Sequence, residues 1–401
     1  MAKRKIPEIK NLYYITHVEN LLSILERGIL CHQLIEQQGL NYTKIYDANI
    51  VSSRKAKKTP DGKNLWEYAN LYFQPRNPML YRVIHEKGEK ELAILGVRKQ
   101  VMEAQGSFLT DGNAANDPTN FFAPREGLKE IHKNWEIIDG EWWNSVDGSK
   151  RKIMAECLVP QTIPPDSIHT IFVADHTIAD KVRPRLRANA PPVVPEPPMF
   201  FCPARNYKIS SSLKLAEGDM FFSRCQTLTV SVNVVGIMGK GLASRAKYQF
   251  PDVYVTYQDA CRQKKLRIGK PYLYKREALF DDELADDPAT LSAPNGAKWF
   301  LLFATKRHWR DNSDLQGIDQ GLQWLAENYK SERIRSLAMP ALGCGLGNLD
   351  WKDVGPVMCR RLSSMEIPVV IYLPRERQIP AEHLSANYLL GNPPPSQTSL
   401  L

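Results

Sequence analysis

The stretch GIMGKGLASRAKYQF at residues 236–250 places three glycines directly before a helical pattern. Closely spaced glycines let backbone N–H groups converge on an anion, and a helix N-terminus adds a partial positive charge. The spacing matches neither GxxxxGK[ST], the P-loop pattern, nor GxGxxG, the Rossmann pattern. A single loop of this kind is also compatible with a tight turn that holds no ligand. A second glycine cluster, ALGCGLGNLDW at 341–351, favours a diphosphate gripped from both sides.

Continuous apolar runs alternate with helical patterns on either side of the two glycine loops. The runs are TLTVSVNVV (227–235), WFLLFAT (299–305), IRSLAMP (334–340) and IPVVIYL (367–373). Apolar strands that alternate with helices are typical of a largely parallel sheet covered on both faces. Ligands of such sheets bind beyond the carboxyl ends of the strands, where both glycine loops fall. The second half is therefore predicted to be a three-layer α/β/α domain with its site at that edge.

The first half has a different pattern, in which short aromatic and β-branched runs are separated by Gly, Pro and Asn. These runs are NLYFQP (70–75), MLYRVI (79–84), LAILGV (92–97) and IMAECLV (153–159). They predict a mixed α+β domain built around antiparallel strands. Near the N-terminus, Thr16 and Glu19 have the spacing of a capping box, and Gly28 stands where a C-cap glycine would end the helix.

Proline marks the boundary between the two halves. Residues 188–206 include six prolines, which disfavour a helix and a central strand, so this stretch is interpreted as a semi-rigid linker. The predicted organisation is a first domain over 1–187, a linker over 188–208, a second domain over 209–377 and a flexible tail over 378–401. The acidic stretch 279–300 is expected to be a surface loop of the second domain.

Composition narrows the classes of partner and of site. The 401 residues suffice for two domains, and the net charge of +9 favours a polyanionic partner, with nucleic acid ahead of a membrane surface. The seven cysteines are scattered and lack zinc-ligand spacing, which argues against a disulfide framework and against a metal site. No apolar run approaches the length of a membrane span, and the basic N-terminus lacks the apolar core of a signal peptide. A cytoplasmic protein is expected.

Three blocks of the second half resemble the macrodomain fold, and specifically the DNA-de-ADP-ribosylating DarG antitoxins. The blocks are VNVVGIMGKGLASRAKYQFPDVYVTYQDAC (232–261), FATKRHWRDNSDLQGIDQGL (303–322) and LAMPALGCGLGNLDW (337–351). The resemblance covers residues 213–374 and implies that ADP-ribose binds between the two glycine loops. The implied ligand contacts are Asn233, near the distal ribose, and Gly236, Gly239, Lys240, Gly241, Gly343, Gly345, Leu346 and Gly347.

The same resemblance implies that Lys306, in TKRHWR, is the catalytic group of this domain. Desolvation beside cations such as Arg307 and Arg310 favours a neutral amine, which can act as a nucleophile or general base. The alternative for Lys306 is a solvated surface lysine. Val230 stands where the family usually has an asparagine, and a macrodomain that only binds ADP-ribosylated DNA is the alternative to a hydrolase.

Four blocks of the first half resemble DarT, a class of toxin that ADP-ribosylates bases in single-stranded DNA. The blocks are YYITHVEN (13–20), RKAKKTPDGKNLWEYANLYFQPRNPMLYRV (54–83), SFLTDGNAAND (107–117) and RKIMAECLVP (151–160), and the resemblance covers residues 10–187. It implies NAD as co-substrate, Glu156 as the catalytic carboxylate, and Arg54 as a second catalytic group that also contacts NAD. The other implied NAD contacts are His17, Val18, Glu19 and Gly28.

Each of these assignments has a simpler alternative. Glu156 could be a strand residue that faces water, and His17 could be a core histidine that helps to cap the helix. Asn113, in TDGNA, stands where the family commonly has a histidine near the target base. Thymine is the acceptor that the resemblance implies, and guanine is the second choice because Asn113 departs from the family's pattern.

A basic run followed by aromatic residues supports DNA binding independently of the resemblance. The basic residues are Arg54, Lys55, Lys57 and Lys58, and the aromatic residues are Trp66, Tyr68, Tyr72 and Phe73. This pattern suits contacts to phosphates and stacking on the bases of a single strand. The expected DNA contacts are Lys55, Lys57, Lys58, Tyr72, Arg76, Met79 and Asn113. A solvated basic loop ahead of ordinary core aromatics is the alternative.

Together these expectations describe a fusion of a NAD-dependent DNA ADP-ribosyltransferase toxin with the macrodomain that removes its product. The expected partners are single-stranded DNA, NAD and ADP-ribose, with no membrane and no metal. The alternatives are a macrodomain that only binds ADP-ribose or ADP-ribosylated DNA, and a transferase that modifies RNA or protein.

Overall fold

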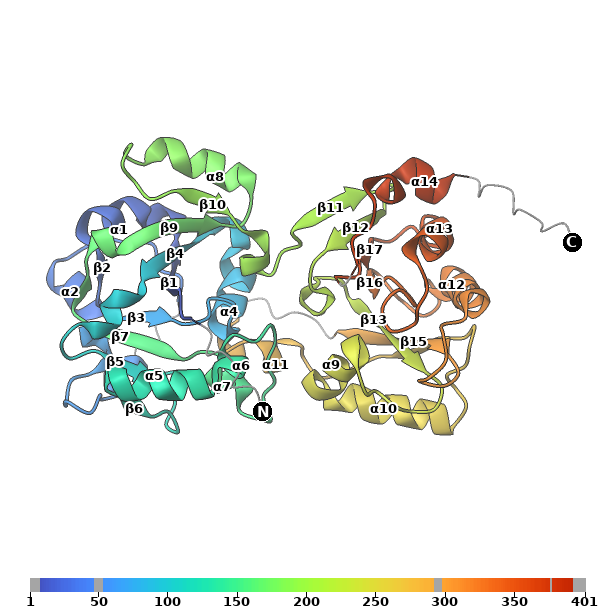
Figure 1. The fold of residues 1–401 in the computed structure, drawn as a ribbon, viewed down its shortest axis with the longest axis horizontal. Coiled ribbons are helices and arrows are strands. Elements are labelled where there is room, and N and C mark those ends of the chain that lie inside the picture. The colour runs from blue at the N-terminus through green and yellow to red at the C-terminus, as the bar shows by residue number, and fades with distance from the viewer. Residues whose placement is uncertain (1–7, 47–52, 292–297, 376, 392–401) are drawn as a thin grey trace, which may run out of the picture. The chain divides into compact units, whose positions relative to one another are not determined.

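The computed structural model describes residues 8–46, 53–291, 298–375 and 377–391. The chain folds into two compact units (Figure 1). The first unit comprises residues 1–201 together with 281–294, and the second comprises residues 202–280 together with 295–401. The boundary at residue 201 falls inside the stretch that the sequence predicts to be a linker.

The first unit is built on one eight-stranded sheet. In spatial order its strands are β10 (Val193–Pro195), β9 (Ile168–Val173), β4 (Leu92–Arg98), β1 (Asn11–His17), β3 (Tyr68–Tyr72), β7 (Glu156–Pro160), β5 (Phe108–Thr110) and β6 (Phe121–Phe122). Neighbouring strands are antiparallel except β10 and β9, which confirms the expected α+β fold around antiparallel strands.

Shorter elements surround this sheet. A two-stranded ladder joins β2 (Ile29–Leu30) to β8 (Thr162–Ile163). The helices of the first unit are α1 (Leu21–Arg27), α2 (His32–Gln37), α4 (Pro78–Lys87), α5 (Pro124–Lys133), α6 (Trp135–Ile138), α7 (Ser149–Lys152), α8 (His176–Val182) and α11 (Asp281–Leu284).

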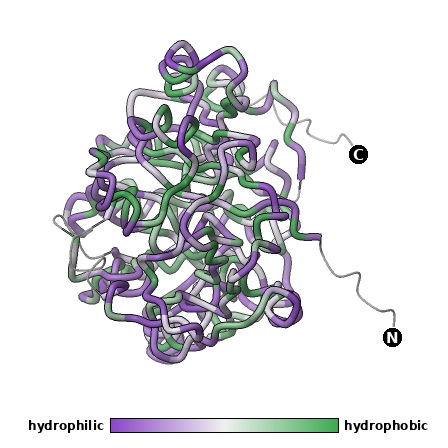
Figure 2. Tube along the Cα trace, turned by 90° about the vertical axis from the view of Figure 1, so that its left-hand side faces the viewer, coloured by the Kyte–Doolittle hydropathy of each residue, from purple (hydrophilic) through white to green (hydrophobic). Residues whose placement is uncertain are grey.

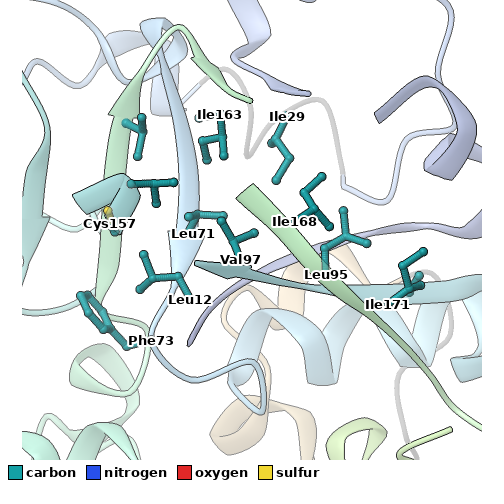
Figure 3. Packing of buried hydrophobic residues seen from close by; sticks show 14 of the residues in the cluster. Leu12, Ile29, Leu71, Phe73, Leu95, Val97, Cys157, Ile163, Ile168 and Ile171 are labelled. Atoms are coloured by element: carbon teal, nitrogen blue, oxygen red, sulfur yellow. The ribbon is translucent and has the colours of Figure 1, made fainter. Parts of the chain in front are cut away.

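Alternate residues of the strands point to opposite faces of the sheet. One face carries the main apolar core, in which Leu12 of β1 and Leu71 of β3 pack together (Figure 3). Directly opposite one another across β1, β3 and β7 lie Tyr13, Tyr72 and Glu156, which alternate with those core residues. The sheet therefore separates the apolar core from a row of polar side chains.

Two local expectations for the first half are wrong. The run MLYRVI lies in α4 rather than in a strand, because Asn77 caps this helix with its side chain and a proline occupies the first turn. Thr16 lies inside β1, and the cap is His17, whose Nδ1 accepts a hydrogen bond from the N–H of Glu19 at 3.1 Å. The histidine replaces the predicted capping box.

The proline-rich stretch does not form a linker. Val193–Pro195 add an edge strand to the first sheet, and residues 197–200 form a 3₁₀ helix in which Phe200 is buried. Arg205–Lys208 already belong to the second unit as β11. The expected linker over 188–208 is wrong because an edge strand tolerates prolines that a central strand excludes.

Residues 281–291 of the acidic stretch that the sequence predicts to be a surface loop pack into the first unit, whereas Trp299 and Phe300 at its end already belong to β15 of the second unit. The hydrogen bonds that hold it run from the Tyr81 hydroxyl to Asp281 (3.0 Å), from Arg82 Nε to Asp286 (2.7 Å) and from Trp143 Nε1 to the carbonyl oxygen of Leu284 (3.1 Å). Arg82 and Leu284 are fully buried. The expectation of a solvated loop is wrong because α4 supplies polar partners for the acidic side chains.

The second unit is built on a seven-stranded sheet. In spatial order its strands are β11 (Arg205–Lys208), β12 (Leu213–Glu217), β17 (Val369–Tyr372), β16 (Leu337–Pro340), β13 (Thr227–Asn233), β15 (Trp299–Lys306) and β14 (Tyr272–Tyr274). The five strands from β12 to β15 run parallel, and the edge strands β11 and β14 pair antiparallel. The helices are α9 (Gly241–Gln249), α10 (Pro251–Arg262), α12 (Leu315–Asn328), α13 (Trp351–Leu362) and α14 (Ala386–Leu390).

Helices cover both faces of this second sheet (Figure 1). Leu301 and Phe303 of β15 belong to the apolar core that includes α12 and α13, whereas the ring of Phe300 packs 5.2 Å from that of Phe250, which lies between α9 and α10. The expected three-layer α/β/α architecture is confirmed. The expected flexible tail is wrong up to residue 391, because Leu389 of α14 is buried in the same core; residues 392–401 lie outside the described residues.

Hydrophobic segments run through the inside of the fold, and its outer turns are largely hydrophilic (Figure 2). Within the described ranges, no helix is both long and apolar enough to cross a membrane. The same residues contain no group of three His, Cys, Asp or Glu side chains able to hold a metal ion.

Candidate active sites of the two units

Glu156 begins β7 and is fully buried. Its carboxylate accepts two hydrogen bonds from the guanidinium of Arg54, one from Nη1 at 3.2 Å and one from Nη2 at 2.9 Å. The backbone N–H of Ala114 also donates to Oε1, at 2.9 Å. A buried carboxylate with a bidentate cation and a third donor is fixed in one orientation. The alternative in which Glu156 faces water is therefore wrong.

The loop that carries Ala114 to Glu156 is shaped by Asn113. The side-chain oxygen of Asn113 accepts a hydrogen bond from the N–H of Ala115 at 2.9 Å, and its carbonyl oxygen accepts one from the Thr119 hydroxyl at 2.7 Å. Asn113 is half-buried and adjoins the residue whose N–H contacts the carboxylate. The position that the sequence associates with the target base therefore lies beside Glu156.

Burial changes the acid–base behaviour of the groups around Glu156. Burial alone would lower the pKa of Arg54, but the carboxylate of Glu156 outweighs it and raises this pKa above its ordinary value. Burial, reinforced by the same carboxylate, raises the pKa of Tyr72. The raised pKa of Arg54 keeps its guanidinium charged at neutral pH, and the raised pKa of Tyr72 keeps its phenol neutral.

Residues expected to bind NAD lie at the turn that follows β1. His17 is the last residue of β1 and points to the same face as Tyr13, because residues four apart on a strand share a face. Val18 is buried. Glu19 is exposed and accepts hydrogen bonds from Arg185 at 2.8 and 2.5 Å. The turn thus borders the polar face of the sheet and is fixed by an ion pair.

Gly28 ends α1 with a φ of 88°, as the C-cap expectation requires. A Cβ atom at this position would lie 2.3 Å from the carbonyl oxygen of Ile163. Backbone geometry therefore accounts for the glycine, and any contact between Gly28 and NAD would be made by the main chain.

In the second unit, Asn233 organises the first glycine loop. Its Oδ1 accepts a hydrogen bond from the Tyr257 hydroxyl at 2.8 Å, and its Nδ2 donates to the carbonyl oxygen of Ile237 at 2.7 Å. Gly236 and Gly241 have φ values of 84° and 62°, which side chains disfavour. The loop is held in its shape by the protein itself, through these hydrogen bonds of Asn233.

Lys306 lies beside Asn233, because the two residues are partners in the register of β13 and β15. The Nζ of Lys306 donates to the carbonyl oxygens of Leu346 and Asp311, at 2.9 and 3.0 Å. Gly343 of the second glycine loop has a φ of 75°. The hydrogen bond from Lys306 to Leu346 connects the end of β15 to the second glycine loop.

The remaining residues expected to bind ADP-ribose also belong to the two loops. Gly239, Lys240 and Gly345 are exposed, and Gly347 is buried. Because β13 pairs with both β15 and β16 in parallel, both loops emerge at the carboxyl edge of the sheet, as expected.

Two family models match the chain. The model described as "ssDNA thymidine ADP-ribosyltransferase, DarT" matches residues 13–201, and the model described as "Macro domain" matches residues 290–358. A "DNA ADP-ribosyl transferase-DNA ADP-ribosyl glycohydrolase fusion protein" of Thermosipho africanus is 55% identical over 387 residues, which are 96% of this chain and 100% of that protein. The chain belongs to the DarT–DarG fusion proteins.

Solved and curated relatives agree with this membership. The structure described as "Thermosipho africanus DarTG in complex with ADP-ribose" has a TM-score of 0.90 and 54% identity, and the match covers 95% of this chain and 100% of that chain. A "DNA ADP-ribosyl glycohydrolase" of Thermus aquaticus is 33% identical over 165 residues, which are 41% of this chain and 42% of that protein. The first unit is accordingly called the transferase unit and the second the macrodomain.

Part of the DNA-contact set expected for the transferase unit of this DarT–DarG fusion is exposed. Lys55 and Lys58 lie on the surface, and the Nζ of Lys55 lies 4.6 Å from the ring centroid of Trp66. Lys57 is half-buried and pairs with Asp117 at 3.1 Å. Lys55, Lys58 and Trp66 thus retain the basic and aromatic character expected of a single-strand contact.

The aromatic residues of β3 and the position after it do not fit the same expectation. Tyr68, Tyr72 and Phe73 are 2%, 4% and 3% exposed, which leaves no ring face for a base. The expectation that these rings stack on bases is therefore wrong. Tyr72 instead lies next to Glu156 in the sheet. Arg76, two residues before α4, and Met79, in its first turn, are half-buried.

His32 is a candidate site residue that the sequence interpretation missed. The hydroxyl of Tyr46 lies 3.1 Å from Nδ1 of His32, and the ring of Trp66 lies 5.5 Å away. Burial, reinforced by the charges of Arg54 and Lys44, lowers the pKa of His32 to about 4. No local pattern identifies His32, because these neighbours come from different segments of the chain.

Val230, where the family usually has an asparagine, is fully buried in the macrodomain sheet opposite Leu302. Val230 occupies the middle of β13, three residues before Asn233, and its apolar side chain packs in the core. Val230 therefore gives no support to the alternative of a macrodomain that binds without hydrolysing.

Proposed function

We propose that the transferase unit moves ADP-ribose from NAD to a thymine base of single-stranded DNA, and that the macrodomain hydrolyses this product. The observation that carries the transfer is the buried carboxylate of Glu156, which Arg54 and the N–H of Ala114 hold in one orientation. The observation that carries the reversal is the register pair of Asn233 and Lys306 between the two glycine loops. Membership of the fusion family supports the combination of the two activities.

Glu156 has two tasks in the transfer. When the bond from the ribose C1″ carbon to the nicotinamide nitrogen breaks, its electron pair leaves with nicotinamide and the ribose becomes oxocarbenium-like. The carboxylate stabilises this positive charge. A ring nitrogen of thymine then forms a bond to C1″, and Glu156 accepts the proton that this nitrogen loses. An ionised, oriented carboxylate suits both tasks.

The NAD contacts are placed along the polar face of the sheet. Arg54 fixes Glu156 and supplies a positive charge suited to the NAD diphosphate. His17, with Val18, Glu19 and Gly28 at the following turns, borders the other end of this face. We place NAD between the turn after β1 and Glu156, because His17 and Glu156 lie on the same face of the sheet, on strands that β3 joins.

The acceptor strand is placed over the exposed basic surface of the transferase unit. Lys55 and Lys58 can contact phosphates, and Trp66 offers a partly exposed ring beside Lys55. Asn113 lies beside Glu156, at the point where a base must approach C1″. A base edge is accessible there only in an unpaired strand.

Lys306 is the proposed catalytic group of the macrodomain. Its hydrogen bonds to two carbonyl oxygens occupy two N–H groups of an ammonium and leave the third for the substrate. In hydrolysis the bond from C1″ to the thymine nitrogen breaks, and its electron pair leaves with the base, which Lys306 protonates. A water molecule adds to C1″, and the proton that it loses restores the ammonium. We favour this general-acid role over the nucleophile or general base expected from the sequence.

Location and metal use follow from the same chemistry. We place the protein in the cytoplasm, where NAD and single-stranded DNA occur together. Arg54 and Lys306 supply the positive charge that each reaction needs, so we propose that neither reaction uses a metal.

Labelled NAD tests the acceptor. Single-stranded DNA, RNA and an unrelated protein are each incubated with the enzyme and isotope-labelled NAD and analysed by mass spectrometry. We expect ADP-ribose on thymine of the DNA. Label on guanine would show that the departure at Asn113 changes the base, and label on RNA or protein without any on DNA would refute the proposed function.

A further inference from the structure

The loop between β15 and α12, residues 307–313, lies between the two glycine loops of the macrodomain. At one end, the N–H of Val234 in the first glycine loop donates to the carbonyl oxygen of Arg307 at 3.2 Å. At the other end, the N–H of Ser313 donates to the carbonyl oxygen of Gly347 in the second glycine loop at 2.9 Å. The loop is therefore attached to both sides of the proposed ADP-ribose site.

Trp309 is at the centre of this loop and is 46% exposed. The guanidinium of Arg310 lies 4.5 Å from the indole centroid, and the ring of His308 lies 5.2 Å from it. The N–H of His308 donates to the carboxylate of Asp311 at 2.8 Å, and the N–H of Arg310 donates to Nδ1 of His308 at 3.3 Å. These bonds order the turn, yet the indole stays at the surface instead of entering the core.

Other exposed apolar side chains lie on the adjoining loops. Val235 and Ile237 of the first glycine loop are 47% and 46% exposed, and Leu346 of the second is 62% exposed. Lone exposed apolar residues are ordinary, but several on three adjoining loops mark a contact surface. With Arg307 and Arg310 on the middle loop, the surface combines an aromatic ring and cations, which suits a nucleobase flanked by phosphates.

We propose that Trp309 is a stacking platform for a base of the ADP-ribosylated strand, with Arg307 and Arg310 placed for its phosphates. The proposal rests on the proposed function, because it takes the glycine loops to hold ADP-ribose and Lys306 to act at the bond to the base. Lys306 precedes this loop and donates to Asp311 within it, so the base side of the substrate adjoins the loop. Trp309 is then the residue that separates ADP-ribosylated DNA from free ADP-ribose.

Kinetics of the full chain without NAD test this role. We expect Trp309→Ala to raise the KM for an ADP-ribosylated oligonucleotide about tenfold, which is the order expected for loss of one stacked base. The dissociation constant for free ADP-ribose should stay within about twofold, and Trp309→Phe should recover most of the oligonucleotide affinity. A matched control is Tyr388→Ala, which removes another exposed aromatic ring, on α14, and should change neither quantity.

The outcomes separate the two proposals. An unchanged oligonucleotide KM in Trp309→Ala overturns the platform, and so does an equal loss of free ADP-ribose affinity, which would make Trp309 a structural part of the loop. A wild-type chain that fails to bind ADP-ribose refutes the proposed function of the macrodomain itself.

Discussion

Replacing Glu156 by glutamine keeps an acceptor for the N–H of Ala114 and removes the charge that the transfer needs. We expect Glu156→Gln to lower the transfer rate at least about 100-fold, measured as ADP-ribosylated oligonucleotide formed from NAD. Hydrolysis of a purified ADP-ribosylated oligonucleotide by the same variant should be unchanged, because the macrodomain is a separate unit.

Glu156→Gln should also destabilise the transferase unit, because Arg54 is left with a buried charge that has lost its ionic partner. Loss of one partner of a buried pair costs about 3 kcal/mol of folding free energy. The double variant Glu156→Gln, Arg54→Met should regain part of this stability in thermal unfolding and remain inactive. Activity in either variant would rule out the carboxylate as the catalytic group.

The lowered pKa of His32 predicts that the free energy of unfolding depends on pH. Its pKa is lowered to about 4 in the folded protein, so the unfolded state binds the proton more tightly. The stabilisation is complete above pH 6.5, the ordinary value, and is lost as the pH falls toward 4. Between pH 7.5 and pH 5 the transferase unit should lose about 2 kcal/mol through His32 alone.

Denaturant unfolding of wild type and His32→Gln at the two pH values measures this contribution. We expect the difference in stability between the two pH values to be smaller in the variant. An equal pH dependence in both proteins would assign the acid sensitivity to other groups.

Part of the candidate sites could be predicted from the sequence. Glu156, Arg54, Asn233 and Lys306 stand in blocks that resemble known families, and the structure brings each pair together. Tyr72 failed as a DNA contact because both faces of β3 are covered there: Leu71 and Tyr72 point to opposite faces and both are buried. His32 could not be predicted, because its environment comes from segments distant in the sequence.

Segment 281–291 is an element of the second half of the sequence that completes the transferase unit. Asp286 is the partner of the fully buried Arg82, at 2.7 Å, and Glu86 is a second partner at 3.6 Å. Asp286→Asn should therefore destabilise the transferase unit by about 2 kcal/mol, the scale of a hydrogen bond to a charged group.

Hydrogen exchange of α4 measures the effect locally. Faster exchange is expected in Asp286→Asn, whereas Asp282→Asn, at an exposed neighbouring position, should match wild type. Equal protection in all three proteins would show that the segment contributes nothing to the transferase unit. A chain that ends at residue 201 lacks this segment and should be less stable than the same unit in the full chain.

Elements with local signals were predictable, and those with distant partners were not. The apolar runs of β13, β15, β16 and β17 predicted the parallel sheet, and φ values above zero confirm the glycine turns. The prediction of a strand for MLYRVI was wrong because a short apolar run fits a helix or a strand. Here the side-chain cap from Asn77 favours the helix. The acidic stretch failed because Asp286 finds its partner 204 residues away.

At the scale of the whole molecule, the chain joins a transferase that ADP-ribosylates DNA to a glycohydrolase that removes the ADP-ribose. One polypeptide keeps the macrodomain at high local concentration near the transferase product, which limits self-poisoning without any new contact. The division into two units was foreseen from length and from the change of pattern between the halves. The placement of segment 281–291 in the transferase unit was not foreseen, because composition carries no information about which unit a loop joins.

The most direct test follows ADP-ribose on one oligonucleotide through both activities. Thymine-containing single-stranded DNA is incubated with NAD and wild type, Glu156→Ala or Lys306→Ala, and the adduct is quantified over time by mass spectrometry. We predict that Lys306→Ala accumulates ADP-ribosylated thymine while binding ADP-ribose, that wild type accumulates little, and that Glu156→Ala forms none but removes adduct supplied to it. Adduct formed by Glu156→Ala, or no more adduct with Lys306→Ala than with wild type, would contradict the account.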